Sequence, residues 1–440
     1  MPLPRTPPSL SEIIDTLDAD FLKDASSEEY TIFAQRANNH YWHWDKVRII
    51  ARGAGLDPEL AWAIIIMARR PLYHTVPIYG FYKHPVRFCL TNLLQRDLSL
   101  IDQQLAGMII SPTEELISHA QREQYIFRAL TEEAIASSLL EGAATTRREA
   151  KEMLQSNRKP RSHGEQMVFN NYRTIQFIRE HHNTNLSLDF ILEIHRLLTE
   201  QTLDEETIGR LRRESDQITV VNKYGEVIHH PPSANQLPQR INQFCKFANQ
   251  TESQNEFIHP IIKACILHYQ FGFDHPFCDG NGRTARALFY WFVLRKKYWL
   301  FEFMPISRLI YRSPGKYSKA YLYAETDDFD VTYFLYYHLK IISRARRELM
   351  EYITQKQQRE IEARKLFIHD QHLNSRQREI LIHMLNKPQS TLTIQQMQRK
   401  FAIAYGTARS DLINLTEGGY LDMSQNGKRY EFNIGPKIQK

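Results

Sequence analysis

Twelve consecutive residues, at positions 275–286, combine groups that bind phosphate with a group that moves a proton. They read His-Pro-Phe-Cys-Asp-Gly-Asn-Gly-Arg-Thr-Ala-Arg. His275 is the member of this run whose ordinary pKa suits accepting a proton near neutral pH. Asp279 offers the hard oxygen ligands that Mg²⁺ prefers. The run therefore predicts chemistry on a nucleoside triphosphate bound together with a metal ion.

The second half of the run predicts a cradle for an anion. Gly280, Asn281 and Gly282 allow a tight turn whose backbone N–H groups point outward. A helix is expected from Arg283 onward, and its positive N-terminal end would face the same point. Arg283 and Arg286 are three residues apart, so they share a helix face and both can reach an anion held there.

Two neighbouring segments are expected to position this run. His259 and Pro260 open an apolar stretch, which predicts a helix with His275 at its far end. Upstream, the β-rich segments Gln217–Val221 and Glu226–His230 flank a turn signal, Asn222–Gly225, which predicts a hairpin. We assign no chemistry to the histidines at 229 and 230, because isolated histidines on such a hairpin are more often surface residues.

The run fills every fixed position of the motif of the Fic (filamentation induced by cAMP) family, His-Pro-Phe-x-Asp/Glu-Gly-Asn-Gly-Arg-x-x-Arg, with Cys278 at the variable position. The resemblance implies transfer of AMP from ATP to a Ser, Thr or Tyr hydroxyl, with release of pyrophosphate. It also implies the site roles: His275 as general base, Asp279 as ligand of Mg²⁺, the backbone of Gly280, Asn281 and Gly282 as anion hole, Arg283 on the phosphate chain and Arg286 on the γ-phosphate. Phe277 is expected to be a buried anchor of the loop.

Residues 217–230 resemble the family's flap, an edge strand that pairs with the backbone of a target protein. The target hydroxyl would be presented there, on another protein or on the chain itself. One branch of the family acts as a kinase and carries Lys in place of the glycine at Gly282. This chain keeps the glycine, which favours the usual orientation of the nucleotide.

Residues 131–142 read Thr-Glu-Glu-Ala-Ile-Ala-Ser-Ser-Leu-Leu-Glu-Gly and predict a helix with Thr131 as N-cap and Gly142 just past its end. Ser137 and Glu141 are four residues apart and share one face of that helix. The pattern resembles the inhibitory motif Ser/Thr-x-x-x-Glu-Gly/Asn of Fic proteins. The resemblance implies that Glu141 pairs with Arg286 and blocks productive seating of the γ-phosphate, so the enzyme is expected to be autoinhibited.

The chain of 440 residues and 52.0 kDa is long enough for several domains. We predict a mainly α fold with a Fic-type helical core, a small β-hairpin flap, a helical N-terminal domain and a C-terminal winged helix-turn-helix. The predicted parts are an N-terminal helical domain at 1–109, a Fic domain at 110–345 with the inhibitory helix at 131–142, a connecting helix at 346–369 and a winged helix-turn-helix at 370–440. The helical pattern of the first part extends from about Asp15 to Ile78, and its aromatic residues 41–44 are expected to lie in a core.

The C-terminal part predicts helices at Ser375–Leu385, up to Phe401 and at Tyr405–Thr416, followed by strands Tyr420–Met423 and Arg429–Asn433. This order resembles a winged helix-turn-helix. Its recognition helix would expose Thr407, Arg409, Ser410 and Asn414, and its wing would carry Lys428 and Arg429. A net charge of +6 and a pI near 8.9 permit DNA binding but do not require it, because many winged helices bind proteins.

The four cysteines show no paired spacing and are expected to be reduced thiols, which indicates a cytoplasmic protein. No signal peptide is recognised, and no apolar stretch approaches the roughly 20 residues that cross a bilayer, so no membrane partner is expected.

Two classes of function remain open from the sequence. The first is an autoinhibited AMP transferase, or a related enzyme that removes AMP with Glu141 positioning water. The second is a DNA-binding regulator whose Fic module senses nucleotide. ATP is favoured over CDP-choline or UTP, which the motif does not exclude because base recognition lies outside it. Neither the target protein nor the oligomeric state follows from the sequence.

Overall fold

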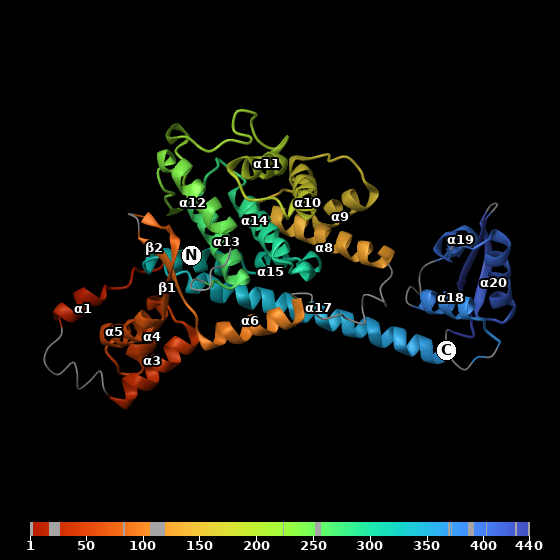
Figure 1. Ribbon diagram of the computed structural model, residues 1–440, viewed down its shortest axis with the longest axis horizontal. Helices are drawn as coiled ribbons and strands as arrows, with labels where there is room; N and C mark the ends of the chain where they lie inside the picture. The colour runs from red at the N-terminus through yellow and green to blue at the C-terminus, as the bar shows by residue number, and fades with distance from the viewer. Residues whose placement is uncertain are drawn as a thin grey trace. The chain divides into compact units, whose positions relative to one another are not determined.

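The computed structural model describes residues 3–16, 27–81, 84–105, 119–222, 224–250, 257–367, 370, 372–385, 391–401, 403–426 and 429–438. The chain forms two compact units, Met1–Arg346 and Arg347–Lys440, and each is described by itself. Helices dominate both units, which confirms the predicted mainly α class (Figure 1). The boundary predicted between residues 109 and 110 falls within 106–118, outside the described residues, and the division into four domains stays a prediction.

The first unit begins with a small helical cluster built on aromatic residues. Its core includes Phe33, Trp42, Trp44 and Trp62, all less than 9% exposed, so the aromatic stretch at 41–44 packs inside as predicted. Its helices are α1 (Leu10–Thr16), α3 (Glu28–His40), α4 (Trp44–Gly53) and α5 (Pro58–Arg69).

The expected helical pattern up to Ile78 is wrong from Tyr73 onward, where the chain forms a β-hairpin. Strands β1 (Tyr73–Tyr79) and β2 (Pro85–Cys89) pair antiparallel, and a short 3₁₀ turn at Arg70–Leu72 precedes them. Val76 and Ile78 point inward from β1 and are almost fully buried. Alternating burial of β-branched side chains favours a strand. In this segment that alternation determines the structure, and the apolar spacing expected for a helix does not.

The rest of the first unit is a helical assembly around α13 (Pro260–Asp274) and α14 (Asn281–Arg295), which lie side by side at its centre (Figure 1). Nearly every side chain of both helices is buried, as expected for helices that are covered on all sides. The surrounding elements are α6 (Asn92–Leu105), α8 (His119–Leu140), α9 (Arg147–Ser156), α10 (His163–His181), α11 (Leu188–Thr199), α12 (Leu237–Asn249), the 3₁₀ turn Trp299–Phe303, α15 (Ile306–Tyr311), α16 (Pro314–Thr326) and the start of α17 (Thr332–Phe367).

Helix α8 contains the predicted inhibitory segment but is longer than expected. Thr131 is an interior, buried residue of α8, so its assignment as N-cap is wrong: the apolar face continues upstream through Ile126 and Leu130. The end of α8 agrees with the prediction, because Gly142 takes a left-handed conformation with φ of 83°. The backbone N–H of Ala143 donates to the carbonyl of Ser138 at 3.0 Å, which closes the turn and places Glu141 immediately after the helix.

A buried carboxylate attaches α8 to the core. Glu133 is 3% exposed, and it accepts hydrogen bonds from the Tyr290 hydroxyl at 3.0 Å and the Ser307 backbone N–H at 2.8 Å. The Ser307 hydroxyl also donates to it. Burial raises the pKa of Glu133, and these three donors oppose that effect. Glu133 therefore joins α8 to α14 and α15.

Replacing Glu133 by Ala is expected to destabilise the first unit by about 3 kcal/mol, because three buried donors lose their acceptor. The matched control is Glu132→Ala, whose partner Arg147 is 49% exposed, and it is expected to cost less than about 1 kcal/mol. Urea unfolding followed by tryptophan fluorescence measures both, since all five tryptophans lie in the first unit. Equal costs for the two variants would contradict the anchoring role of Glu133.

The second unit contains the end of α17 and a small mixed fold. Its elements are α18 (Ser375–Leu385), β5 (Leu392–Thr393), α19 (Ile394–Phe401), α20 (Tyr405–Glu417), β6 (Leu421–Asn426) and β7 (Arg429–Ile434). The strands form one antiparallel sheet in the order β5-β7-β6, over a core that includes Ile380, Leu412 and Phe432. The order of elements is the predicted one; the wing residue Lys428 lies outside the described residues, and the classification as a winged helix stays a prediction.

Candidate active site

His275 lies at the C-terminal end of α13 in a left-handed backbone conformation, with φ of 46°. Its Nδ1 is 3.2 Å from the carbonyl oxygen of Gly272, so Nδ1 carries the proton and Nε2 is left as the acceptor. Burial lowers the pKa of His275 to about 4, and the hydrogen bond to Gly272 opposes this only in part. The imidazole is therefore neutral near pH 7, the form that a general base requires.

The carbonyl groups around His275 are held by Arg212, a residue to which the sequence analysis assigned no role. The Arg212 Nε donates to the carbonyl of His275 at 2.8 Å, and Nη2 donates to that of Asp274 at 3.3 Å. The Arg212 backbone N–H donates to the carbonyl of Pro276 at 2.8 Å. A cation at the C-terminal end of a helix also interacts favourably with the helix dipole.

The loop after His275 is held by residues on both sides. His195 of α11 accepts the Gly209 N–H at Nδ1 (3.0 Å), so its Nε2 donates to the carbonyl of Asp279 (3.0 Å). The ring of His195 stacks on fully buried Phe277 at 3.7 Å, which agrees with the expected anchor role of Phe277. Sequence reasoning did not single out His195, because a lone histidine on an apolar helix gives no signal of what it contacts.

Asn281 bonds to the loop through both ends of its side chain. Its Oδ1 accepts the Phe277 N–H at 2.9 Å, and its Nδ2 donates to the Phe277 carbonyl at 2.8 Å. Helix α14 begins at Asn281, two residues earlier than expected, after Gly280 in a left-handed conformation. The first backbone N–H groups of α14 have no carbonyl within the helix, so Asn281, Gly282 and Arg283 present them at the helix end.

Two buried guanidinium groups face this end of α14 with unused donors. Arg283 is 1% exposed and donates through Nη1 to the Leu198 carbonyl at 3.0 Å, while its Nε and Nη2 have no hydrogen-bond partner among the residues that the structure describes. Arg286 is 3% exposed, and its Nη1 makes no hydrogen bond of ordinary geometry to any described residue. Buried donors without acceptors are rare, and their convergence beside free backbone N–H groups fits an anionic ligand such as a phosphate chain.

Glu141 lies over the same place. Its Oε1 accepts from Arg286 Nη2 at 2.8 Å, while Ser137 accepts from Arg286 Nε through its hydroxyl oxygen at 2.8 Å. A Cβ atom at Gly282 would overlap the Glu141 carboxylate, which shows how closely that group approaches the start of α14. Burial alone would lower the pKa of Arg286, but the neighbouring Glu141 carboxylate raises it. Ser137, Glu141 and Arg286 thus form one contact.

Asp279 is the exposed carboxylate of the loop. Its side chain is 55% exposed, and Oδ2 lies 3.5 Å from Arg283 Nη2. Within the described residues, no three His, Cys, Asp or Glu side chains gather into a metal site. A metal ion at Asp279 would therefore share its remaining ligands with phosphate and water, as Mg²⁺ commonly does.

The predicted flap is present but shorter than expected, with β3 (Val220–Val221) paired antiparallel to β4 (Val227–His229). The interpretation of His229 as a surface residue is wrong. It is 8% exposed, with Nδ1 at 2.9 Å from Glu325 Oε2 and Nε2 at 2.8 Å from the carbonyl of Phe273. His230 is exposed, as expected. His229 thus ties the flap to the end of α13.

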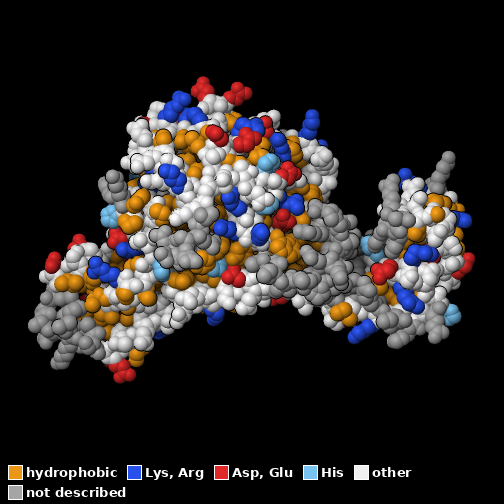
Figure 2. Space-filling model, in the orientation of Figure 1, with side chains coloured by type: hydrophobic (Ala, Val, Ile, Leu, Met, Phe, Trp, Pro, Cys, Tyr) orange, Lys and Arg blue, Asp and Glu red, His pale blue; other side chains and the backbone are white. Residues whose placement is uncertain are grey.

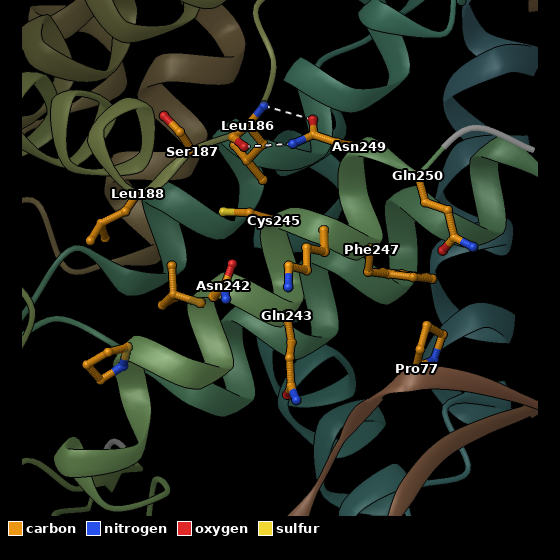
Figure 3. A pocket seen from close by; sticks show the side chains of 13 residues that line it. Pro77, Leu186, Ser187, Leu188, Asn242, Gln243, Cys245, Phe247, Asn249 and Gln250 are labelled. Atoms are coloured by element: carbon orange, nitrogen blue, oxygen red, sulfur yellow. Dashed lines mark hydrogen bonds between the residues drawn. The ribbon is translucent and has the colours of Figure 1, made fainter.

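A separate open pocket of about 980 Å³ lies along α12, between that helix and the start of α11. Figure 3 shows Asn249 bonded to the backbone of Leu186 at its edge, at 2.9 and 2.7 Å. The pocket contains no residue of 275–286, and the basic side chain that lines it is Lys246. It therefore does not offer the two arginines and the base that lie together at the ends of α13 and α14.

The histidine signal of His275 is expected to titrate near pH 4, about 2.5 units below the ordinary value. The unfolded state then binds more protons than the folded state between about pH 6.5 and 4. The stability that neutral His275 contributes is full above that window and is lost as the pH falls through it. ¹³C NMR of labelled histidine measures the midpoint, with His275→Asn to assign the signal. A midpoint near 6.5 would contradict the buried, neutral base.

Residues 185–293 match the model of the Fic/DOC family. The chain is 36% identical over 104 residues to Protein adenylyltransferase Fic of Nematostella vectensis, which is 24% of this chain and 22% of that protein. It is 27% identical over 209 residues to Protein adenylyltransferase Fic of Aedes aegypti, which is 47% of this chain and 40% of that protein. The chain thus spans less than half the length of these relatives.

Two solved structures resemble the fold. One is a Fic family protein from Desulfovibrio desulfuricans G20, with a TM-score of 0.54, 19% identity and coverage of 80% of this chain and 99% of that chain. The other is Fic-1 from C. elegans, with a TM-score of 0.51, 17% identity and coverage of 79% and 92%. At these identities the likeness shows a shared fold and nothing beyond it.

Proposed function

We propose that this chain, which contains a Fic domain, is a protein adenylyltransferase that moves AMP from ATP to a hydroxyl group of a target protein or of itself, and that Glu141 inhibits it. One observation carries the proposal: a short loop joins buried His275, whose pKa is lowered, to the start of α14, where two buried arginines hold unused donors. Phosphoryl-type transfer needs positioning and charge neutralisation, together with a base for the incoming hydroxyl. The arrangement supplies each of these from this chain's own residues.

In the proposed mechanism, Nε2 of His275 accepts the proton of the target hydroxyl as its oxygen attacks the α-phosphorus. The backbone N–H groups at Gly280–Gly282 and the guanidinium of Arg283 stabilise the charge that develops on the phosphate oxygens. Arg286 orients the γ-phosphate, and pyrophosphate leaves. Asp279 would hold Mg²⁺, which would neutralise part of the phosphate charge. Exposed Val221 and Val227 of the flap would align the target by backbone pairing.

Inhibition follows from competition for Arg286. The Glu141 carboxylate accepts a hydrogen bond from Arg286 and lies beside Gly282, where a γ-phosphate would need to sit. A second anion at the same place would be repelled and would lose its arginine partner. Removing the carboxylate therefore opens the proposed phosphate position without touching His275.

Label transfer from α-³²P-ATP and, separately, γ-³²P-ATP with Mg²⁺ tests this function, with the protein alone and in a lysate. Glu141→Gly is expected to raise α-label transfer roughly tenfold or more, as loss of about 1.4 kcal/mol of competing interaction would do. Glu141→Gly/His275→Ala is expected to abolish it.

Transfer of the γ-label would instead indicate a kinase. If wild-type protein removes AMP from a labelled product and Glu141→Gly does not, the chain catalyses the reverse reaction. Absence of any transfer would leave the Fic module as a nucleotide sensor.

The second unit supports an additional proposal, binding of DNA. It carries 15 lysines and arginines against 10 aspartates and glutamates, and so most of the net positive charge of the chain. Arg409, Ser410 and Asn414 are exposed on α20, and Arg429 is exposed on β7. Thr407 is only half-exposed. Basic and acidic side chains are also interspersed over the face of the first unit shown in Figure 2.

Fluorescence anisotropy with a mixed-sequence DNA duplex tests this second proposal. Full-length protein is expected to bind with a Kd of roughly 10⁻⁴–10⁻⁶ M at physiological salt. Arg409→Ala is expected to weaken binding and to reduce the salt slope by about one, if this arginine contacts phosphate. Arg196→Ala, an exposed arginine of the first unit, is the control. No binding at low salt would point to a protein partner for the second unit.

The cytoplasmic location stays a prediction. Within the described residues, no helix has both the length and the apolar character that a membrane crossing requires.

A further inference from the structure

Asp274, the residue immediately before His275, belongs to a buried ion pair. It is 1% exposed, and its Oδ1 lies 2.7 Å from Arg240 Nε and 2.6 Å from Nη2. Gln270 Nε2 donates to the same oxygen at 2.9 Å. Because the pair is shielded from water, its attraction is screened far less than that of a surface pair.

The same donors also hold the tip of the N-terminal hairpin. The Arg240 guanidinium donates to the carbonyl groups of Tyr79 and Gly80, the latter at 3.2 Å, and Gln270 Nε2 lies 3.1 Å from the Tyr79 carbonyl. Phe81 packs edge-on against Phe273 at 4.8 Å. Gly80 has no space for a Cβ atom, because the ring of Phe329 fills it. Arg240 of α12 and Gln270 of α13 therefore connect the end of β1 to the last turn of α13.

We propose that Arg240 is a positioning residue for His275, and that hairpin β1–β2, which lies outside residues 185–293, thereby forms part of the working active site. His275 is the first residue after α13 and leaves the helix at φ of 46°, so the direction of its ring follows the placement of Asp274. A displacement of a catalytic group by about 1 Å can cost roughly a hundredfold in rate. This inference rests on the proposed function only for its kinetic consequence.

The kinetic test uses full-length protein that carries Glu141→Gly. Arg240→Gln is expected to lower kcat roughly tenfold or more, while KM for ATP changes less than about twofold, because the phosphate cradle on α14 is untouched. Arg240→Lys keeps the charge but not the planar fork, so it is expected to recover only part of the rate. Arg196→Gln, an exposed arginine on α11, is the control and is expected to match the parent.

A second readout does not depend on AMP transfer. In ¹³C NMR of labelled histidine, Arg240→Gln is expected to move the chemical shift and titration midpoint of His275, and Arg196→Gln is expected to leave both unchanged. Asp274→Asn preserves the shape of the side chain and removes its negative charge, so it is expected to move the same signal. This second variant keeps the test decisive if Arg240→Gln folds poorly.

Two results together would overturn the proposal. The His275 signal would be unchanged in Arg240→Gln, and kcat would fall only in proportion to the folded fraction, as measured by tryptophan fluorescence. If the parent transfers no AMP at all, the NMR result still decides the role of Arg240, so failure of the proposed function is distinguished from failure of this inference.

Discussion

The end of α13 is the constraint on which the active-site architecture depends. A helix leaves its last carbonyl groups without internal donors, and here those groups surround the candidate base. Arg212 supplies donors to Asp274, His275 and Pro276, and His229 supplies one to Phe273. Arg212 precedes the flap and His229 ends it. The residues on either side of the flap therefore also hold the backbone around the candidate base.

The opposing end, at the start of α14, has the reverse electrostatic character. Free N–H groups and two buried guanidiniums concentrate positive charge there, and a buried cation without a partner is costly. Within this chain Glu141 supplies the compensating carboxylate. In the proposed function, the donors that would bind phosphate are the ones that hold Glu141, so phosphate and this internal carboxylate would compete for the same place.

Helix α8 combines two carboxylates with different surroundings. Glu133 is enclosed by donors from α14 and α15, whereas Glu141 is 26% exposed and follows the last helical residue. The first holds the helix on the core, and the second reaches the cradle from a turn that Gly142 permits through its positive φ. Glu133 thus fixes α8 on the core, and the less enclosed side chain of Glu141, just after the helix, contacts Arg286.

Several elements could be predicted from local patterns. The helix at Ser375–Leu385 has the predicted bounds, the connecting helix is present within α17, and the two flap strands pair as expected. The predictions of secondary structure were wrong where residues outside the local pattern determined whether a helix or a strand forms. Thr131 has the chemistry of an N-cap, but apolar residues upstream extend α8 past it, and Tyr73–Tyr79 forms a strand because a partner strand pairs with it.

The sequence by itself determined the chemistry of the site. Spacing along one short segment is enough to place a base, a carboxylate, a flexible turn and two arginines together, since residues within a few positions cannot separate far in space. The tertiary structure decided which of these groups are buried and which have hydrogen-bond partners. Arg212, His195, Arg240 and Glu133 lie tens to well over a hundred residues from the groups that they hold, and their types alone give no sign of those contacts. Burial and hydrogen-bond pairing depend on which surfaces meet in the folded chain, so the lowered pKa of His275 became apparent only there. The pairing of Glu141 with Arg286, by contrast, was already implied by the resemblance.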